Sequence, residues 1–318
     1  MLDGIVLQLV MLAVSLVTLA GASHFTIKSI EKLVELTGLS DASAGFIILS
    51  VMTTLPEITV ASFAIFEGVP AISIGDILGS HVFNIGIVVG VLAVFGSLRA
   101  CCTELMIELV DLLFLASIIP LLLVIFQITH VGPLFSSPLV GAVLLGIFAF
   151  SIYRMSKTRS PASLDPASKA ARRKGWKKTG LFIAVGAALV IVASRVTVSS
   201  ASEIASLLGI FPVLIGARIV AVGTSLPELT FGLTAVRRGR VHLALGDAIG
   251  ANLTTITLVL GLVFLLSPFQ VNLTAFAEIL LFVLASNLIL WRYLTKGGVS
   301  QVGGIVLIMI YVLFQAVF

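Results

Sequence analysis

The sequence predicts an all-α polytopic membrane protein with ten transmembrane helices, arranged as two inverted repeats of five. Three observations lead to this prediction. The chain of 318 residues is 59% hydrophobic and 11% charged, and its mean hydropathy of +1.21 is typical of helical membrane proteins. Apolar stretches of spanning length occur ten times along the chain. A pair of polar motifs then recurs in both halves of the chain.

Each of the ten apolar stretches approaches the length of about 20 residues that crossing the hydrocarbon core requires. We expect helices over residues 4–25, 43–66, 70–97, 104–127, 133–154, 179–201, 211–236, 242–267, 272–291 and 300–318. No basic residues precede the first stretch, which therefore predicts a retained helix rather than a cleaved signal peptide. Cys101 and Cys102 are adjacent, so an intrachain disulfide framework is not expected.

Lysine and arginine gather in the loops that follow the first, third, fifth, seventh and ninth predicted helices. With ten spans these loops share one side, which the positive-inside rule makes cytoplasmic. We therefore expect a multi-pass protein of the cell membrane with both termini outside. The net charge of +4 reflects this topology and does not indicate nucleic-acid binding. The most basic loop, residues 155–178, is predicted to link a first half, 1–154, to a second half, 179–318.

The two halves are related by an internal duplication. Glu228 lies 171 residues after Glu57, and the same offset aligns Gly75-Asp76 with Gly246-Asp247. The matching segments are residues 43–97 and 211–267. Because each half has five helices, an odd number, the halves are expected to cross the membrane in opposite senses. Such inverted repeats place a shared site near the midplane and reach it by alternating access.

The duplicated segments carry a hydroxyl pair, a leucine, a proline and a glutamate. They read Thr53-Thr54-Leu55-Pro56-Glu57 and Thr224-Ser225-Leu226-Pro227-Glu228. A carboxylate at bilayer depth costs about 2.5–3.5 kcal/mol on insertion scales, so it predicts a functional site. Proline leaves a carbonyl oxygen of the preceding turn without its donor, and the hydroxyls share a helix face with the glutamate. Hydroxyls of this kind also bond to their own helix, but beside a duplicated glutamate these oxygens predict a site for a hard cation.

Polar or small side chains recur every four residues on the next helix of each repeat. They are Asp76, Ser80 and Asn84 in the first repeat, and Asp247, Ala251 and Thr255 in the second, with Asn252 alongside. We expect Ser80 and Asn84 to coordinate cations. For Asp76 and Asp247 two interpretations stay open: they hold helix ends one turn from the site, or they bind protons. The neighbouring glycines allow close helix approach.

These motifs resemble the α-repeats of the cation/calcium exchanger superfamily, in particular its sodium/calcium exchanger branch of prokaryotic type. The family's G-T-S-x-P-E element stands as Gly223–Glu228 and, more loosely, as Met52–Glu57. Its G-N-x-x-G-S-N element stands as Gly75–His81 and Gly246–Asn252. The resemblance covers both halves. It implies a non-enzymatic antiporter without a cofactor, active as a monomer, with a central Ca²⁺ site and flanking Na⁺ sites.

Carried over by position, the resemblance implies a role for each polar residue. Ca²⁺ would be bound by Glu57 and Glu228 together with main-chain oxygens of Thr53 and Thr224. Na⁺ or shared sites would use Thr54, Ser225, Ser80 and Asn84, and the backbone near Ser50 and Ala221. Asp76, Asp247 and Thr255 would lie beside the site or bind protons. Since Ala251 and Thr255 depart from the family pattern, one sodium site is expected to lose a side-chain oxygen.

Three alternatives to Na⁺/Ca²⁺ exchange remain. One is a proton-coupled exchanger of Ca²⁺ or another divalent cation, although the G-N-x-x-E element typical of that branch is absent. A second is an intramembrane aspartyl protease using Asp76 and Asp247, which would leave the duplicated glutamates without a purpose. A third is a channel, for which no filter-like run is present. The partners expected in the preferred interpretation are inorganic cations and the lipid bilayer.

Overall fold

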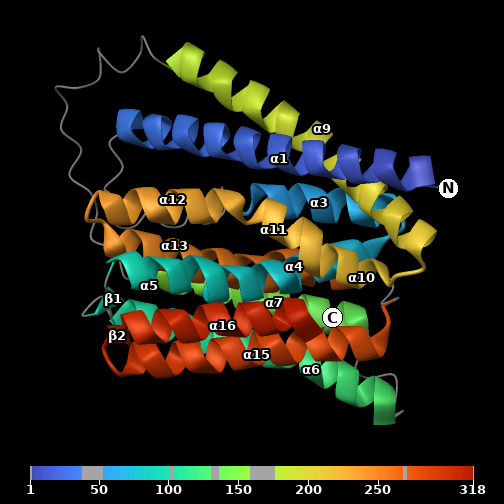
Figure 1. Ribbon diagram of the computed structural model, residues 1–318. Coiled ribbons are helices and arrows are strands. Elements are labelled where there is room, and N and C mark those ends of the chain that lie inside the picture. Colours follow the sequence, from blue (N-terminus) through green and yellow to red (C-terminus); the bar gives the residue numbers. More distant parts are fainter. Residues whose placement is uncertain are drawn as a thin grey trace.

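The computed structural model describes residues 2–37, 53–96, 98–99, 104–129, 136–157, 176–267 and 271–317 (Figure 1). The first half contains α1 (Leu2–Thr37), α3 (Leu55–Phe66), α4 (Pro70–Phe83), η1 (Asn84–Val89), α5 (Gly90–Gly96), β1 (Leu98–Arg99), α6 (Glu104–Thr129) and α7 (Ser137–Lys157). The second half contains α9 (Trp176–Leu208), α10 (Pro212–Ile215), η3 (Gly216–Val220), α11 (Ala221–Thr224), α12 (Leu226–Arg237), α13 (Val241–Thr254), η4 (Thr255–Val259), α14 (Leu260–Leu266), α15 (Leu273–Thr295), β2 (Gly298–Val299) and α16 (Gln301–Val317). Here η denotes a π-helix.

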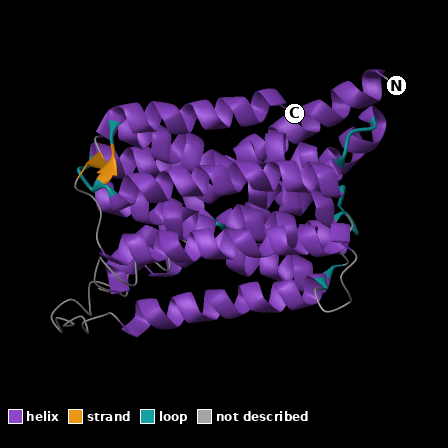
Figure 2. Ribbon diagram, turned by 90° about the horizontal axis from the view of Figure 1, so that it is seen from below, coloured by secondary structure: helices purple, strands orange, loops and turns teal. Residues whose placement is uncertain are grey.

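The described helices confirm the predicted ten-helix membrane architecture. Eight helical segments are long and apolar enough to cross a membrane, and two shorter apolar helices, α3 and α16, complete the set. Only the part of the predicted helix 43–66 from residue 53 onward is described. Residues 158–175 of the predicted linker also lie outside the described residues. Figure 2 shows the helices lying roughly along one common direction, as membrane spans do.

Two helices extend much further than predicted. The apolar stretches end at residues 25 and 201, but α1 continues to Thr37 and α9 to Leu208. Hydropathy marks where a helix can lie in lipid, whereas a helix ends only where the backbone is interrupted. Neither extension contains a glycine or a proline, so nothing in these residues stops the helix at the end of the apolar stretch.

The backbone repeats the internal duplication seen in the sequence. Helix α3 and helix α12 each begin after a residue outside helical geometry, Thr54 (φ −81°, ψ 6°) and Ser225 (φ −91°, ψ 2°). The π-helices η1 and η4 begin at Asn84 and Thr255, again 171 residues apart. In Figure 1, α3 and α12 extend in opposite directions from the middle of the bundle. This is the arrangement expected for inverted repeats.

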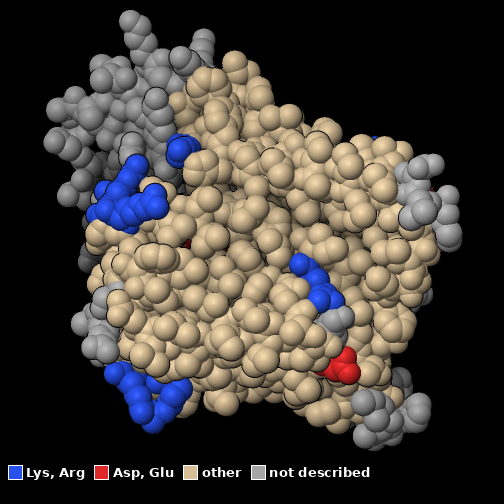
Figure 3. Space-filling view, viewed as in Figure 1, with Lys and Arg blue, Asp and Glu red and all other residues tan. Residues whose placement is uncertain are grey.

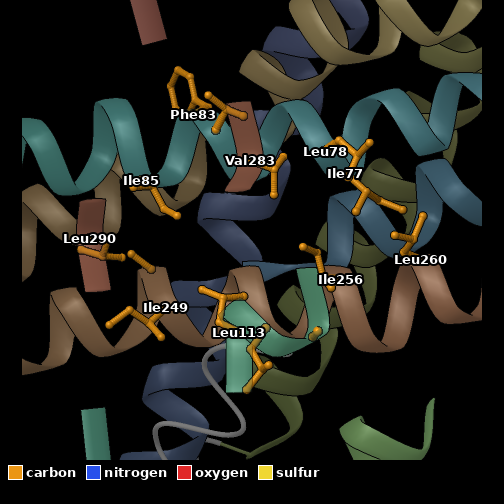
Figure 4. Close-up of a cluster of buried hydrophobic side chains, with 14 of the residues drawn as sticks. Ile77, Leu78, Phe83, Ile85, Leu113, Ile249, Ile256, Leu260, Val283 and Leu290 are labelled. Carbon is orange, nitrogen blue, oxygen red and sulfur yellow. The ribbon is translucent and has the colours of Figure 1, made fainter. Parts of the chain in front are cut away.

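The centre of the bundle is formed by the two spans that follow α3 and α12. In the spans Pro70–Gly96 and Val241–Leu266, 83% and 78% of an apolar stretch of 18 residues are buried, against 22% in the span of α1. Figure 4 shows part of the main core, a cluster of buried side chains to which Ile77 of α4, Ile249 of α13, Leu113 of α6 and Val283 of α15 all belong. Helices α1 and α9 form a smaller, separate core with α3.

The two halves touch backbone to backbone where α4 crosses α10 and η3. A Cβ atom on Gly75 would lie 2.0 Å from the carbonyl oxygen of Val213, and one on Gly79 would lie 2.1 Å from that of Ala217. From the opposite side, a Cβ on Gly216 would lie 2.2 Å from the carbonyl oxygen of Ile72. The predicted close approach is therefore confirmed for Gly75 and Gly79, and it holds the halves together beside the polar residues of α4.

Charged side chains avoid most of the visible surface. In Figure 3 the lysine and arginine side chains gather mainly at the left end of the molecule, and the broad middle is almost uncharged. At the same end, β1 pairs antiparallel with β2, joining Leu98 to Val299 between the end of α5 and the start of α16 (Figure 1). The sequence analysis did not predict these strands, because two residues are too few to show a strand period.

Candidate cation site

Two buried glutamates, one from each half, form the centre of the candidate site. Glu57 lies in the first turn of α3 and is 0% exposed, and Glu228 lies in the first turn of α12 and is 1% exposed. Both begin their helices beside a proline, which fits the first helical turn because it has no N–H to satisfy there. All four carboxylate oxygens are buried without a hydrogen-bond partner among the described residues. Such groups normally have a partner, so this arrangement points to a bound cation.

The surroundings of the glutamates are acidic. Glu228, Asp76 and Asp247 lie close enough to repel a charge on Glu57. The ion pairs found among the described residues, Arg154–Glu108 and Arg195–Glu67, involve other acids. No protein cation therefore compensates the two glutamates in the part of the chain that is described, and a charge on either of them has to be balanced by a bound cation or a proton.

The predicted hydroxyl ligands are all buried, and two of them meet across the two halves. Thr53, Thr54, Thr224, Ser225 and Ser80 are all 0% exposed. The hydroxyl of Ser80 lies 3.1 Å from that of Thr224 and 3.5 Å from the carbonyl oxygen of Ala221, which joins residues of opposite halves. The Ser225 hydroxyl is buried without a hydrogen-bond partner. The structure thus brings together hydroxyls that are more than 140 positions apart in the sequence.

The amide of Asn84 has its orientation set by Asn252. Asn252 donates through Nδ2 to the main-chain oxygen of His81 (3.3 Å), so its Oδ1 is left to accept from Asn84 Nδ2 (3.0 Å). Asn84 Oδ1 is then buried and without a partner. A buried, unpaired amide oxygen costs about 1–3 kcal/mol, and a cation at this position would remove that cost. Asn252 was noted from the sequence but not predicted as a site residue, although it is the last asparagine of the repeated motif.

A second chain of hydrogen-bonded polar side chains holds α4 through His81. Ser117 donates to its own helix at Leu113, and Asn287 donates to Ser117 through Nδ2 (2.7 Å). Asn287 Oδ1 therefore faces His81 Nε2 at 2.7 Å as an acceptor, and the histidine proton lies on Nε2. This chain ties α4 to α6 and α15. Sequence spacing gives no sign of it, because Ser117 and Asn287 come from helices outside the repeated motifs.

The predicted site also includes Thr255 and Ser50, and position 251, where a side-chain oxygen is missing. Thr255 donates to the main-chain oxygen of Asn252 at 3.1 Å, within its own helix, and Ala251 has no side-chain oxygen. Ser50 lies outside the described residues. Among the residues that are described, no three His, Cys, Asp or Glu side chains come together closely enough to hold a metal ion. A cation between Glu57 and Glu228 would therefore need hydroxyl, amide or main-chain oxygens as well.

Two further charged residues, Arg218 and Asp111, form polar contacts away from this site. Arg218 of η3 donates to the side chain and the main chain of Gln315 in α16. Asp111 of α6 is exposed and accepts a hydrogen bond from Trp291 Nε1 of α15 at 2.8 Å. Neither contact reaches the buried acids.

Two inverted halves that bury carboxylate, hydroxyl and amide oxygens between apolar helices define a membrane transporter of the antiport type. The chain belongs to the family described as "Sodium/calcium exchanger protein", whose sequence pattern matches residues 7–157 and 178–318. The unmatched residues between these two ranges, 158–177, lie within the predicted linker 155–178. As a member of this family, the protein is a transporter and not an enzyme.

Relatives cover nearly the whole chain. It is 28% identical to sodium/calcium exchanger MaX1 of Methanosarcina acetivorans, over 98% of this chain and 99% of that protein. It is also 28% identical to the inner membrane protein YrbG of Escherichia coli, over 82% of both chains. Among solved structures, the sodium-calcium exchanger NCX_Mj matches with a TM-score of 0.66 and 25% identity, over 98% of this chain and 99% of that chain.

Proposed function

We propose that the protein is a secondary antiporter that exchanges Ca²⁺ for Na⁺ across the cell membrane by alternating access. The observation that carries the proposal is the pair Glu57 and Glu228, buried between the two halves with four unpartnered carboxylate oxygens. The family assignment supports the same exchange. It favours transport over the intramembrane protease alternative.

Each polar residue has a proposed role in this exchange. Glu57 and Glu228 bind Ca²⁺ with the main-chain oxygens of Thr53 and Thr224. Na⁺ uses oxygens drawn from Thr54, Ser225, Ser80 and Asn84 and from the backbone near Ser50 and Ala221. Hard cations prefer such all-oxygen sites. Because Thr255 is bonded to its own helix and Ala251 lacks an oxygen, we expect fewer side-chain ligands for Na⁺ in the second half than in the first.

Charge explains why the two ions would exchange. Two carboxylates that face each other in a medium of low dielectric repel, and they need a compensating charge. Ca²⁺ supplies two positive charges, and Na⁺ ions can supply them instead. The two cargoes therefore compete for the same acids, and an empty, doubly charged site should resist moving between the two sides. The site is almost fully buried, so ions can reach it only when the halves move relative to each other.

The proposed organisation follows the sequence analysis. Residues 1–154 and 179–318 form the two halves, with repeats at 43–97 and 211–267, and residues 155–178 form a basic cytoplasmic linker. Both termini lie on the outer side of the cell membrane. A single chain surrounded by lipid is sufficient for transport. The first residues of α1 and the last residues of α16 lie toward the same end of the bundle in Figure 1, which supports the proposal that both chain termini are on one side of the membrane.

Flux measurements in proteoliposomes test the function directly. Vesicles loaded with Na⁺ and diluted into Na⁺-free buffer should accumulate radiolabelled Ca²⁺, and vesicles with equal Na⁺ on both sides should not. A pH gradient without Na⁺ separates this proposal from the proton-coupled alternative. Uptake driven by the pH gradient alone would contradict Na⁺ coupling, and downhill Ca²⁺ flux that needs no counter-ion would indicate a channel.

Replacing Asn252 with Leu tests the orientation of the Asn84 amide. Loss of the acceptor for Asn84 Nδ2 removes a hydrogen bond of about 1 kcal/mol, so the Na⁺ concentration for half-maximal exchange should rise roughly fivefold. The Ca²⁺ requirement should change much less, since Asn84 is proposed to serve Na⁺. Asn84→Leu sets the upper limit of the effect. Equal increases in the Na⁺ and Ca²⁺ requirements, or no change in either, would argue against this role.

A further inference from the structure

Each half of the protein holds a hydroxyl of the other half through a buried aspartate. Thr224 Oγ1 donates to Asp76 Oδ1 at 2.8 Å, and Thr53 Oγ1 donates to Asp247 Oδ1 at 3.3 Å. All four side chains are at most 2% exposed. The two contacts are related by the offset of 171 residues, so they belong to the repeated architecture. We call these two hydrogen bonds the crossed clasps.

The clasps hold the chain at the point where each functional helix breaks. Thr224 directly precedes Ser225, the residue with non-helical geometry before α12, and Thr53 directly precedes Thr54 in the same way. Pro227 has no N–H, so the carbonyl four residues earlier lacks its helical donor and the local backbone is held less firmly. A side-chain anchor from the opposite half can restore this positioning.

The shortest contact of the Thr224 hydroxyl is the one with the carboxyl group. Its hydrogen could also reach the main-chain oxygens of Ala221 at 3.2 Å and Val220 at 3.3 Å. Asp76 Oδ1 is nearer, at 2.8 Å, and hydrogen bonds to carboxylates are stronger than those to neutral carbonyls. The hydrogen therefore points to Asp76, which leaves the Thr224 oxygen to accept from Ser80 at 3.1 Å.

We propose that Asp76 and Asp247 are positioning residues of the cation site, and this inference rests on the proposed function. Each aspartate fixes the threonine that precedes the helix break of the opposite half, and with it the main-chain oxygen and the glutamate that bind Ca²⁺. In this proposal the aspartates are not Ca²⁺ ligands. Their Oδ1 atoms accept from the threonines, while Asp76 Oδ2 is buried without a hydrogen-bond partner. The two aspartates lie near Glu57 and Glu228, but among the described residues no three of these acids are arranged so that they could hold a metal ion by themselves.

The two clasps differ in the contacts that the structure gives them. Ser80 lies within 3.4 Å of Asp76 Oδ1 and 3.1 Å of Thr224, so the first clasp contains two hydroxyls. The second clasp has Ala251 in the place of Ser80, and its hydrogen bond is longer. Substitutions in the pair Asp76–Thr224 should consequently have the larger effect.

Binding of radiolabelled Ca²⁺ to the purified full-length protein tests the first clasp. Asp76→Ala and Thr224→Val should each raise the Ca²⁺ concentration for half-maximal binding on the order of tenfold, because a buried partner is left unpaired. The double variant should bind no more weakly than the weaker single variant, since both changes remove one contact. Thr224→Ser and Asp76→Asn retain a donor and an acceptor, and should stay within about threefold of the unmodified protein.

Thr234→Val is the matched control, because it removes an exposed hydroxyl of α12 that bonds only to Thr230 within the same helix. It should leave Ca²⁺ binding unchanged. If Asp76→Ala or Thr224→Val does not fold, Asp76→Asn and Thr224→Ser still decide the matter. Strong loss of binding in Asp76→Asn would show that the charge itself matters and would overturn the positioning role. Full binding by Asp76→Ala, or multiplied losses in the double variant, would overturn it as well.

Ca²⁺ binding and exchange by the unmodified protein show whether this inference or the proposed function has failed. If it exchanges and binds Ca²⁺ while the variants fail to follow the expected pattern, only the clasps are wrong. If it neither binds nor exchanges Ca²⁺, the proposed function fails, and the positioning role fails with it because there is no cation to position.

Discussion

Replacing Glu57 with Gln is expected to abolish Ca²⁺ exchange while leaving the protein folded. Glutamine has nearly the same size, so packing around α3 is retained, but one of the two charges that hold Ca²⁺ is removed. Loss of one partner from a buried charge contact costs about 2–5 kcal/mol, so Ca²⁺ affinity should fall roughly 30-fold or more. Uptake of radiolabelled Ca²⁺ under an outward Na⁺ gradient, with thermal unfolding of the same sample, measures both parts of this expectation.

Because the two halves are related by the internal duplication, the same prediction applies to Glu228. Glu228 is as deeply buried as Glu57 and equally without a partner, so Glu228→Gln should fail to the same degree. Glu203→Gln is the matched control, since Glu203 is an exposed acid of α9. Wild-type Ca²⁺ flux in either central variant would contradict the assignment of these glutamates as the principal ligands.

The helices and the repeat could be predicted from the sequence because both depend on local patterns. Hydrophobic length located the spans, and a single offset aligned Glu57 with Glu228 and Asp76 with Asp247. The same offset turns out to relate the π-helices at Asn84 and Thr255. No sequence pattern marks a π-helix, however, because it differs from an α-helix by one hydrogen-bond register. Its presence in both halves could be seen only in the structure.

The contacts of the candidate site were only partly predictable. Motif spacing can place Thr224 and Glu228 on one face of a helix, but it does not say which side chain of the other half meets Thr224. The role of Asp76 therefore stayed open between a structural and a proton-binding interpretation. The hydrogen bond to Thr224 favours the structural one. The polar chain through His81 was also hidden, because its partners lie far away in the sequence.

Replacing Gly79 with Ala should be among the most destabilising single changes in this protein. The added Cβ would lie 2.1 Å from the carbonyl oxygen of Ala217 and 2.6 Å from its Cα. These are backbone atoms, which cannot turn aside as a flexible side chain can. Overpacking commonly costs about 1–3 kcal/mol, and a clash with backbone should reach about 3 kcal/mol or more. Thermal unfolding of the purified protein measures the loss.

The same substitution should also impair transport in any protein that still folds. Gly79 lies on α4 between Asp76 and Ser80, so a wider separation of α4 from η3 draws both residues away from Thr224. Gly146→Ala is the matched control, because Gly146 is an exposed helical position with nothing within 4 Å of an added Cβ. It should be neutral or stabilising by about 0.5–1 kcal/mol. Equal stability and equal Ca²⁺ uptake in the two variants would show that the close crossing of α4 and η3 is not needed to form the site.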